Sequence, residues 1–454
     1  MNEKVRDKMY SILSKKVIYP LGDKLFDTSV IRYYNWLMTT QYWSPTQLRE
    51  LQNTRLNILI RHAYENVPYY RNLLEERGLT NKNIKIVEDL HKLPILTKKI
   101  IRANFEEIKA INIDKYHPIK NATGGSTGDP LQYYISKDLA SINWAGTFRG
   151  WNWAGYQIGD KRIAFGGSSL VPGNPPTLFD SVRSKLERNL KLSAVSMDDA
   201  KYTKYIKIIR NFRPKFIYGY PSSIFLFAEY CSNHGVNDIR FKAVFSTAEV
   251  LLPHYRQKIE AQFNCKVFDE YGSYDGGGQA LECEVHKGFH ISVEKVIMEI
   301  VDEDGKTVPD GQPGRIIVTD LHNYAMPFIR YDVGDISTMD ERPCSCGRSL
   351  PLLKSIEGRT TDIIKLANGV SIAGPAVTLI FKECNVKQYQ LIQVGNNELL
   401  IKIVKGENYS DIDENHFMNI LMHHTGTGIK IGLEYCQDIP VGSNSKYRFI
   451  LSKI

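Results

Sequence analysis

Five short apolar runs decide the fold class of this chain. They are KRIAFGG (161–167), PKFIYGY (214–220), FKAVFSTAE (241–249), CKVFDEYG (265–272) and GRIIVTD (314–320). Each run is short enough for a strand, ends at Gly, Pro or polar residues, and alternates with segments of helical pattern. Strands that alternate with helices are typical of an α/β fold. Farther along, VIMEIVD (296–302) and GRIIVTD flank a polar turn, which predicts an antiparallel pair.

The same pattern divides the chain into three parts. Residues 1–95 are mostly helical in pattern, with a helix expected to begin at Ser44 because Ser is a favourable N-cap and Pro follows it. Residues 96–357 carry the α/β core. Residues 358–454 form a smaller unit, in which we expect the strands YQLIQVG and ELLIKIVKG and a helix near 413–422.

Composition excludes several classes of protein. The chain has 454 residues, 43% hydrophobic and 24% charged, which is ordinary for a folded protein and excludes disorder. No run of about 18 apolar residues is present, and the N-terminus lacks the pattern of a signal peptide. The net charge of +8 is diffuse, which disfavours nucleic-acid binding. Seven cysteines without a dense framework favour reduced thiols and a cytoplasmic location.

Residues 3–26 form an amphipathic helix candidate. Val5, Met9, Ile12 and Leu13 recur at helical spacing among several lysines. One interpretation is peripheral docking on an anionic surface such as the inner membrane. The other, which the commonness of such helices favours, is an arm packed on the body of the protein.

The sharpest local motif is TGGSTGDP at residues 123–130, followed by LQYYIS, a strand candidate. Glycines allow a tight backbone turn that brings successive N–H groups near an oxyanion, and hydroxyl side chains add donors without bulk. The loop suits a polyphosphate, although it lacks the P-loop frame. Taken alone, such a loop is more often a flexible linker.

Eight segments together resemble the adenylate-forming (ANL) enzymes, and more closely the phenylacetate–CoA ligase family with its branch associated with capsular polysaccharide synthesis. In chain order they are NVPYYR (66–71), TGGSTGDP (123–130), GYPSS (219–223), STAE (246–249), DEYGSYD (269–275), RYDVGD (330–335), GRTTD (358–362) and SKYR (445–448). The resemblance runs from about Trp43 to the C-terminus. It implies a large N-terminal α/β domain whose core, 96–357, binds ATP and the acyl group, and a small mobile α+β lid at 358–454.

The resemblance also assigns roles in an ATP-dependent reaction. A carboxylate joins the α-phosphate of ATP, pyrophosphate leaves, and the acyl group is then transferred. Because two anions must meet, the site has to neutralise charge and align the reactants. The residues implied in cofactor binding are Thr123, Ser126, Thr127, Gly128, Glu249, Tyr271, Gly272, Ser273, Asp335 and Arg359. Lys446 would bridge the acid and the α-phosphate, and Asp335 would accept from the ribose hydroxyls.

Three departures from the family pattern concern charge and the hinge. Asp275 occupies the catalytic position where the family usually has Glu, a Mg²⁺ ligand, so Glu270 and Glu249 are alternative ligands. Leu131 replaces the usual Lys after the loop. Thr361 occupies the hinge position, which does not exclude hinge motion because hinges need only tolerant torsions.

A second donor set predicts a metal site. Cys344 and Cys346 form a tight Cys-x-Cys turn, and Cys283 and His290 lie about 55 residues earlier. Two thiolates, a third Cys and a His make a closed set for structural Zn²⁺. Some members of the resembled family carry the same arrangement. His286 competes with His290, and the alternative to a metal is a set of ordinary thiols.

The substrate and acceptor follow from the resemblance in outline only. Tyr220, Ser246 and Tyr274 would contact the acid, with Tyr218 and Phe245 as further aromatic lining or as ordinary core residues. We expect a small carboxylic or amino acid. The acceptor is coenzyme A or an amine or hydroxyl of a glycan precursor in capsule synthesis. The rival interpretation is a catalytically weakened scaffold of a polysaccharide-assembly complex.

Overall fold

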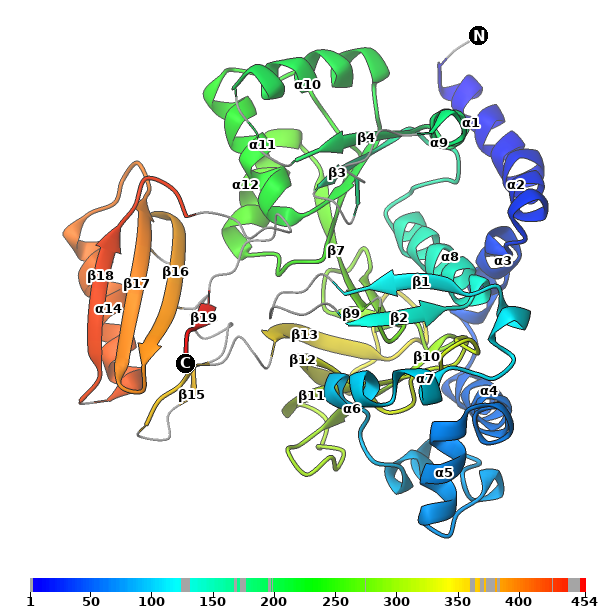
Figure 1. Ribbon diagram of the computed structural model, residues 1–454. Helices are drawn as coiled ribbons and strands as arrows, with labels where there is room; N and C mark the ends of the chain where they lie inside the picture. Colours follow the sequence, from blue (N-terminus) through cyan, green and yellow to red (C-terminus); the bar gives the residue numbers. More distant parts are fainter. Residues whose placement is uncertain are drawn as a thin grey trace.

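The computed structural model describes every residue except 1–2, 124–130, 167–169, 172–176, 195–196, 198, 274, 360–363, 368–370, 373–379, 382–383, 427 and 440–449. Its N-terminal quarter is helical (Figure 1). The elements there are α1 (Glu3–Leu13), η1 (Ser14–Ile18), α2 (Tyr19–Phe26), α3 (Val30–Thr40), α4 (Pro45–Asn66), α5 (Pro68–Glu76), η2 (Asn81–Asn83), η3 (Val87–Lys92), α6 (Lys98–Ala103), α7 (Phe105–Ile108) and η4 (Ile113–Tyr116).

An 11-stranded sheet forms the centre of the large domain, in the order β10-β11-β12-β13-β9-β8-β7-β6-β5-β3-β4. Its parallel half consists of β3 (Arg162–Gly166), β4 (Asn189–Ser193), β5 (Phe216–Gly219), β6 (Ala243–Thr247) and β7 (Lys266–Ser273). Its antiparallel half consists of β8 (Gly278–Glu282), β9 (Phe289–Ile291), β10 (Val296–Val301), β11 (Pro313–Asp320), β12 (Tyr331–Asp340) and β13 (Leu352–Arg359). Strand β7 joins the halves, because it pairs parallel with β6 and antiparallel with β8.

Helices cover both faces of the parallel half, which explains why its strands are continuous apolar runs. They are α8 (Lys137–Trp153), α9 (Leu178–Leu186), α10 (Asp199–Phe212), α11 (Pro221–Asn233) and α12 (Pro253–Phe263). On one face, Trp151 of α8 stacks on Phe245 of β6, with ring centroids 4.9 Å apart. Within the second core cluster, Phe227 of α11 packs on Phe165 of β3 at 5.6 Å.

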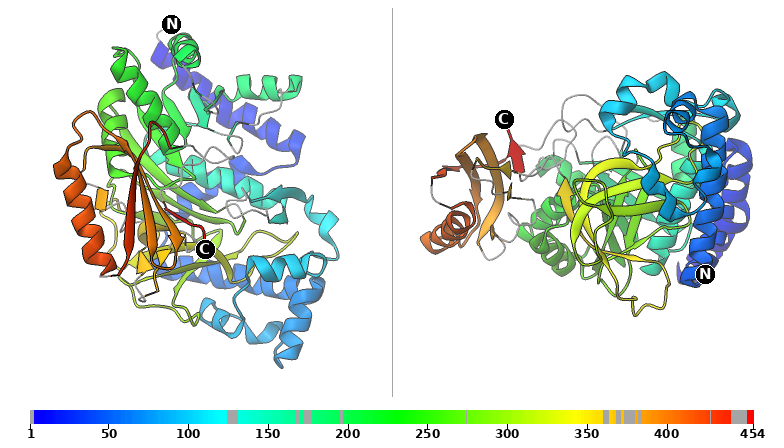
Figure 2. Two further views of the ribbon diagram at one scale, coloured as in Figure 1. Left: turned by 60° about the vertical axis from the view of Figure 1, so that its left-hand side comes forward. Right: turned by 90° about the horizontal axis from the view of Figure 1, so that it is seen from below.

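The C-terminal unit is a separate small body beside the large domain (Figures 1 and 2). Its sheet has the order β18-β17-β16-β19 and is covered by α14 (Asp411–Thr425). The strands are β16 (Val386–Gly395), β17 (Glu398–Lys405), β18 (Lys430–Tyr435) and β19 (Ile450–Ser452), with the short pair β14 (Ile364–Lys365) and β15 (Ser371–Ile372) before them. An ion pair from Lys387 to Glu229 of α11, 3.6 Å long, links the two bodies.

The structure confirms the α/β prediction and most of the elements expected from sequence. Strands β10 and β11 pair antiparallel, and Ser44 caps α4 in a capping box with Gln47. The strands expected at β16 and β17 and the helix α14 are also present. In the part of the chain that the structure describes, none of the helices has the length and apolar content that crossing a bilayer requires.

Candidate active site and metal centre

The Gly/Ser/Thr loop is held at its base by a β-hairpin. Strands β1 (Ile119–Ala122) and β2 (Gln132–Ile135) pair antiparallel on either side of it. Next to them, the Thr123 N–H donates to the Leu131 carbonyl and the Leu131 N–H donates to the Thr123 hydroxyl, both at 2.9 Å. The predicted phosphate contacts Ser126, Thr127 and Gly128 lie outside the described residues. Thr123 therefore anchors the loop.

The carboxyl ends of the parallel strands bring several motif residues together, as expected for an open α/β sheet. Ser246, at the end of β6, donates its hydroxyl to Asp269 Oδ1 on β7 at 2.6 Å. Desolvation raises the pKa of Asp269 to about 7, and the Ser246 bond opposes the shift. The next residue, Glu270, is buried, accepts from the Thr147 hydroxyl at 3.2 Å, and has its pKa raised to about 7 by burial.

A hydrogen bond across the sheet unites two of the predicted nucleotide contacts. The Tyr271 hydroxyl on β7 donates to Asp335 Oδ2 on β12 at 2.9 Å. In the pairing of β12 with β13, Asp335 lies directly opposite Arg359, so the two residues occupy neighbouring positions in the sheet. Gly272 is exposed, and no atom of the described residues lies within 4 Å of the position that a Cβ would take there.

Asp275 lies in a polar cluster that sequence reasoning only partly anticipated. Its Oδ1 accepts from the Ser273 hydroxyl at 3.0 Å, and its Oδ2 accepts from the Tyr331 hydroxyl at 2.7 Å. The ammonium of Lys98, at the start of α6, is 3.9 Å from Oδ2. Both oxygens therefore already face donors, and each retains a second lone pair.

Glu249 and Tyr220 lie on the β5 side of β6, away from β7. The Glu249 carboxylate accepts the backbone N–H of Ser222 at 3.2 Å, at the N-terminus of α11, where a negative charge is stabilised. Tyr220 is fully buried at the preceding cap position. Of the other aromatic residues suggested for the acid pocket, Tyr218 and Phe245 both pack on Trp151 at 4.9 Å. Tyr274 lies outside the described residues.

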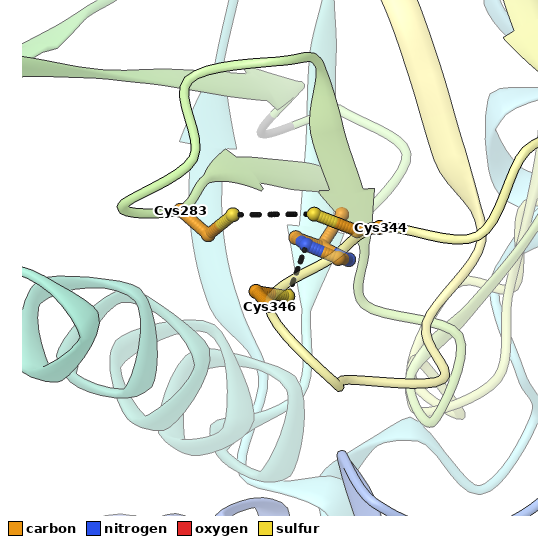
Figure 3. A group of neighbouring side chains, drawn as sticks. Cys283, Cys344 and Cys346 are labelled. Carbon is orange, nitrogen blue, oxygen red and sulfur yellow. Dashed lines mark hydrogen bonds between the residues drawn. The ribbon is translucent and has the colours of Figure 1, made fainter.

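The predicted metal ligands converge beside β8, β9 and β13, the strands of the antiparallel half nearest to β7. Ligand atoms of Cys283, His290, Cys344 and Cys346 all lie within 4.8 Å of one another. Figure 3 shows Cys283 facing Cys344, and their sulfurs are 3.7 Å apart. The Cys346 sulfur is 3.3 Å from His290 Nε2. Gly347, with φ +79°, turns the chain directly after the Cys-x-Cys pair, a backbone conformation that glycine adopts without strain.

These separations fit a tetrahedral Zn²⁺ centre. With Zn–S bonds of about 2.3 Å and Zn–N bonds of about 2.0–2.1 Å, tetrahedral ligands would be about 3.8 Å apart for two sulfurs and about 3.6 Å for sulfur and nitrogen. His290 is also oriented for ligation, because its Nδ1 lies 3.1 Å from the Leu350 carbonyl and can donate to it, which leaves the Nε2 lone pair facing the thiols. His286 instead lies 3.3 Å from Glu282 and outside the four-residue group.

Comparison with known proteins shows which chains this one is similar to in sequence and in fold. The chain superimposes on 2-hydroxyisobutyryl-CoA ligase, solved in the postadenylation state with an acyl-AMP, with a TM-score of 0.74 and 18% identity over 91% of each chain. Residues 365–453 match the CapK C-terminal domain family. Protein CapK of Staphylococcus aureus is 27% identical over 90% of both chains. The chain is therefore similar in sequence to Protein CapK and to the phenylacetate-coenzyme A ligases, and in fold to the adenylate-forming CoA ligases. Phenylacetate-coenzyme A ligase of Thermus thermophilus is 28% identical over 76% of this chain and 78% of its own.

Two residues of this adenylate-forming fold were missed by sequence reasoning. Lys98 and Tyr331 both contact Asp275, from α6 and β12 respectively. Tyr331 belongs to the RYDVGD motif already singled out, so its position beside Asp335 was an available signal. Lys98 follows Thr97, the N-cap of α6, and nothing local distinguishes it from its neighbour Lys99. Lys446 and the side chain of Arg359 lie outside the described residues.

Proposed function

We propose that this protein activates a small carboxylic or amino acid with ATP, releases pyrophosphate, and transfers the acyl group from acyl-AMP to an acceptor. The observation that carries the proposal is the hydrogen bond from Tyr271 to Asp335 at the carboxyl edge of the sheet. It joins two motif residues to which the resemblance assigns the adenine side and the ribose of one nucleoside. The full-length likeness to 2-hydroxyisobutyryl-CoA ligase bound to acyl-AMP supports the same assignment.

In this proposal the nucleotide spans the sheet from the loop to β12. Residues 124–130, held by the Thr123–Leu131 hydrogen bonds, cradle the β- and γ-phosphates. The Asp335 carboxylate accepts from the ribose hydroxyls, which suits an acceptor-only group with two oxygens. Tyr271 supports the adenine side, and Arg359 approaches the ribose from the strand beside Asp335.

The chemical step places an acid oxygen on the α-phosphorus while the bond to the β-phosphate oxygen breaks. Lys446 bridges the two anions as a compact cation, and Lys98 adds positive charge beside Asp275. Mg²⁺, when bound, neutralises the pyrophosphate that leaves. Asp275 and Glu249 are the two carboxylates suited to hold it, since Glu270 is enclosed against Thr147.

The Cys/His cluster holds Zn²⁺ as a structural ion. Cys283, His290, Cys344 and Cys346 would supply all four ligands of such an ion, which would leave no position for a reacting water. The ion would join the loop after β8 to the turn before β13. It would thereby fix the antiparallel strands β8, β9 and β13, which follow β7 in the sheet. The zinc therefore supports the site without taking part in the reaction.

Two acceptors are compatible with the fold. Coenzyme A is favoured by the likeness to the phenylacetate-coenzyme A ligases and by the 2-hydroxyisobutyryl-CoA ligase, whose structures include a complex with acyl-AMP and CoA. An amine or hydroxyl of a glycan precursor, within capsule synthesis, is favoured by the CapK C-terminal match at residues 365–453 and by the 90% coverage of both chains with Protein CapK.

The test is a screen of carboxylic and amino acids for AMP release, with and without coenzyme A. Asp335→Asn should lower acid-dependent AMP release by roughly tenfold to a hundredfold, the expected cost of weakening charged hydrogen bonds. The matched control is Asp340→Asn at the distal end of β12, where Asp340 forms an ion pair with exposed Arg342, and it should remain active. If no acid releases AMP, or if both variants lose activity equally, the scaffold interpretation replaces this one.

A further inference from the structure

The N-terminal arm, residues 3–26 of α1, η1 and α2, packs on the large domain through a face that is largely small and polar, with the Tyr19 ring as an apolar contact. Its buried residues are Asp7, Ser11 and Ser14. The Asp7 carboxylate forms ion pairs of 2.9 Å with both Arg188 and Lys215. Ser14 packs against the turn at Gly159, whose φ is +96°, and a Cβ at that position would collide with the Ser14 side chain. Ion pairs, close backbone approach and the Tyr19 ring, which packs on Phe148 with centroids 5.8 Å apart, together hold the arm on the body.

The outward face of the arm is apolar. Seven large apolar side chains on it are between 42% and 72% exposed, namely Val5, Met9, Ile12, Leu13, Val17, Leu21 and Leu25. Most of these residues are four positions apart. In an α-helix four residues turn through about 400°, so each successive side chain would be rotated by about 40° around the helix axis. The π-helical turn at Ser14–Ile18 takes more residues per turn than an α-helix and so offsets part of this drift along the stripe.

Helix α9 extends the same surface. It lies alongside the arm in both views (Figures 1 and 2), where the Tyr10 hydroxyl donates to the Leu186 carbonyl at 3.0 Å. The Arg188 guanidinium lies over the Tyr10 ring at 3.5 Å. Two further apolar side chains, Val182 and Leu186, are 48% and 46% exposed there. Exposed apolar surface of this extent marks an interaction site more often than an accident of composition.

The charges on this surface are sorted by sign. The exposed residues between Val5 and Leu25 that are not apolar are all basic: Arg6, Lys8, Lys16 and Lys24. On α9 the exposed charges are Arg183 and Lys185, of which Arg183 forms an ion pair of 2.8 Å with Glu187 just after the helix. The acidic residues of this stretch turn inward. Asp7 pairs with Arg188 and Lys215, and Asp23 accepts the Thr28 hydroxyl at 2.6 Å and the N–H groups of Val30 and Ile31.

We propose that this arm surface, the exposed residues of 5–25 with those of 182–186, docks in the plane of an anionic phospholipid bilayer. The apolar stripe enters the boundary between headgroups and acyl chains, and the lysines and arginines contact lipid phosphates. The surface is a convex helix flanked by cations, which fits a headgroup layer. A second copy of the chain is disfavoured as the occupant, because a two-fold interface would place two sets of basic side chains opposite each other.

Vesicle co-sedimentation tests the proposal. The wild-type chain should bind phosphatidylcholine vesicles that contain phosphatidylglycerol and bind weakly to phosphatidylcholine alone. Met9→Glu/Leu21→Glu should lose binding, whereas Ile412→Glu, a matched change at an 81% exposed apolar residue of α14, should retain it. Lys8→Gln/Lys16→Gln should weaken binding by about fivefold for each lysine, the contribution of one cation near an anionic surface.

Three results would overturn the proposal. The first is absence of wild-type binding to the anionic vesicles. The second is equal loss of binding in Ile412→Glu and Met9→Glu/Leu21→Glu. The third is a wild-type dimer in analytical ultracentrifugation that Met9→Glu/Leu21→Glu dissociates, since the stripe would then serve a second copy. Thermal unfolding checks that each variant folds, and if the glutamate variant does not, the two-lysine variant decides.

Discussion

Removal of the metal centre should destabilise the large domain by an amount that can be worked out from the chain. Cys283 and Cys344 are roughly 60 residues apart, and a crosslink that closes a loop of that length restricts the unfolded chain by about 4 kcal/mol. For a cooperative unit of this size, that corresponds to a fall in Tm of roughly 5 °C. We expect Cys346→Ser to show this fall, because it removes one of the four ligands.

The assay combines metal analysis with thermal unfolding. After reconstitution with Zn²⁺, the wild-type chain should carry about one equivalent, and Cys346→Ser should carry little. Trp153 provides the signal, because its ring lies 5.4 Å from the His290 ring and its fluorescence should change when the cluster opens. Cys265→Ser is the matched control, a half-buried cysteine at the start of β7 outside the cluster.

Two outcomes would refute this reasoning. If the reconstituted wild-type chain binds no zinc, the four side chains are ordinary thiols and an imidazole that merely pack together. If Cys265→Ser lowers Tm as much as Cys346→Ser does, the effect belongs to cysteine replacement in general and the crosslink argument fails.

Three further predictions concern charges inside the fold. Arg149→Met should lower the free energy of unfolding, measured by urea titration, by about 3–5 kcal/mol, because it leaves the fully buried carboxylate of Glu294 without its ion-pair partner. Arg210→Met removes an exposed ion pair instead and should lower the free energy of unfolding by at most about 1 kcal/mol. Adding Glu294→Leu to Arg149→Met should recover most of the loss, and a failure to recover would contradict the ion-pair account. Burial raises the pKa of Asp269 from its ordinary 3.8 to about 7 in the folded state. Between those two pH values the folded state binds the proton more tightly than the unfolded state does, so the contribution of Asp269 to stability falls as the pH rises from about 4 to 7. The Tm of Asp269→Asn should therefore rise relative to the Tm of the wild type as the pH increases from 4 to 7. A Tm difference that does not change with pH would contradict the raised pKa of Asp269.

Much of the candidate site was predictable because chemistry restricts which residues can perform it. An acceptor-only carboxylate, a glycine-rich loop and a Cys-x-Cys turn are recognisable within a few residues of sequence. Local rules also predicted the α4 N-cap at Ser44, since the capping box with Gln47 involves neighbouring residues alone. The choice between His286 and His290 needed the structure, because only the fold shows which imidazole faces the thiols.

Long-range contacts account for what could not be predicted. Lys98 comes near Asp275 because Leu96, just before α6, pairs with Tyr331 of β12. No sequence pattern near Lys98 predicts that contact. The arm at residues 3–26 is helical and packs on the body, as the pattern favoured. Its orientation was not predictable, because Arg188 and Lys215, far along the chain, turn the polar face inward through Asp7.

The most direct test of the adenylation mechanism is acid-dependent exchange of labelled pyrophosphate into ATP, measured without any acceptor. The wild-type chain should catalyse exchange with the acid that the AMP-release screen identifies, and Lys446→Ala should abolish it while Lys453→Ala, a lysine in the exposed tail after β19, leaves it intact. Exchange that survives Lys446→Ala, or its absence with every acid that supports AMP release, would contradict the formation of acyl-AMP at this site.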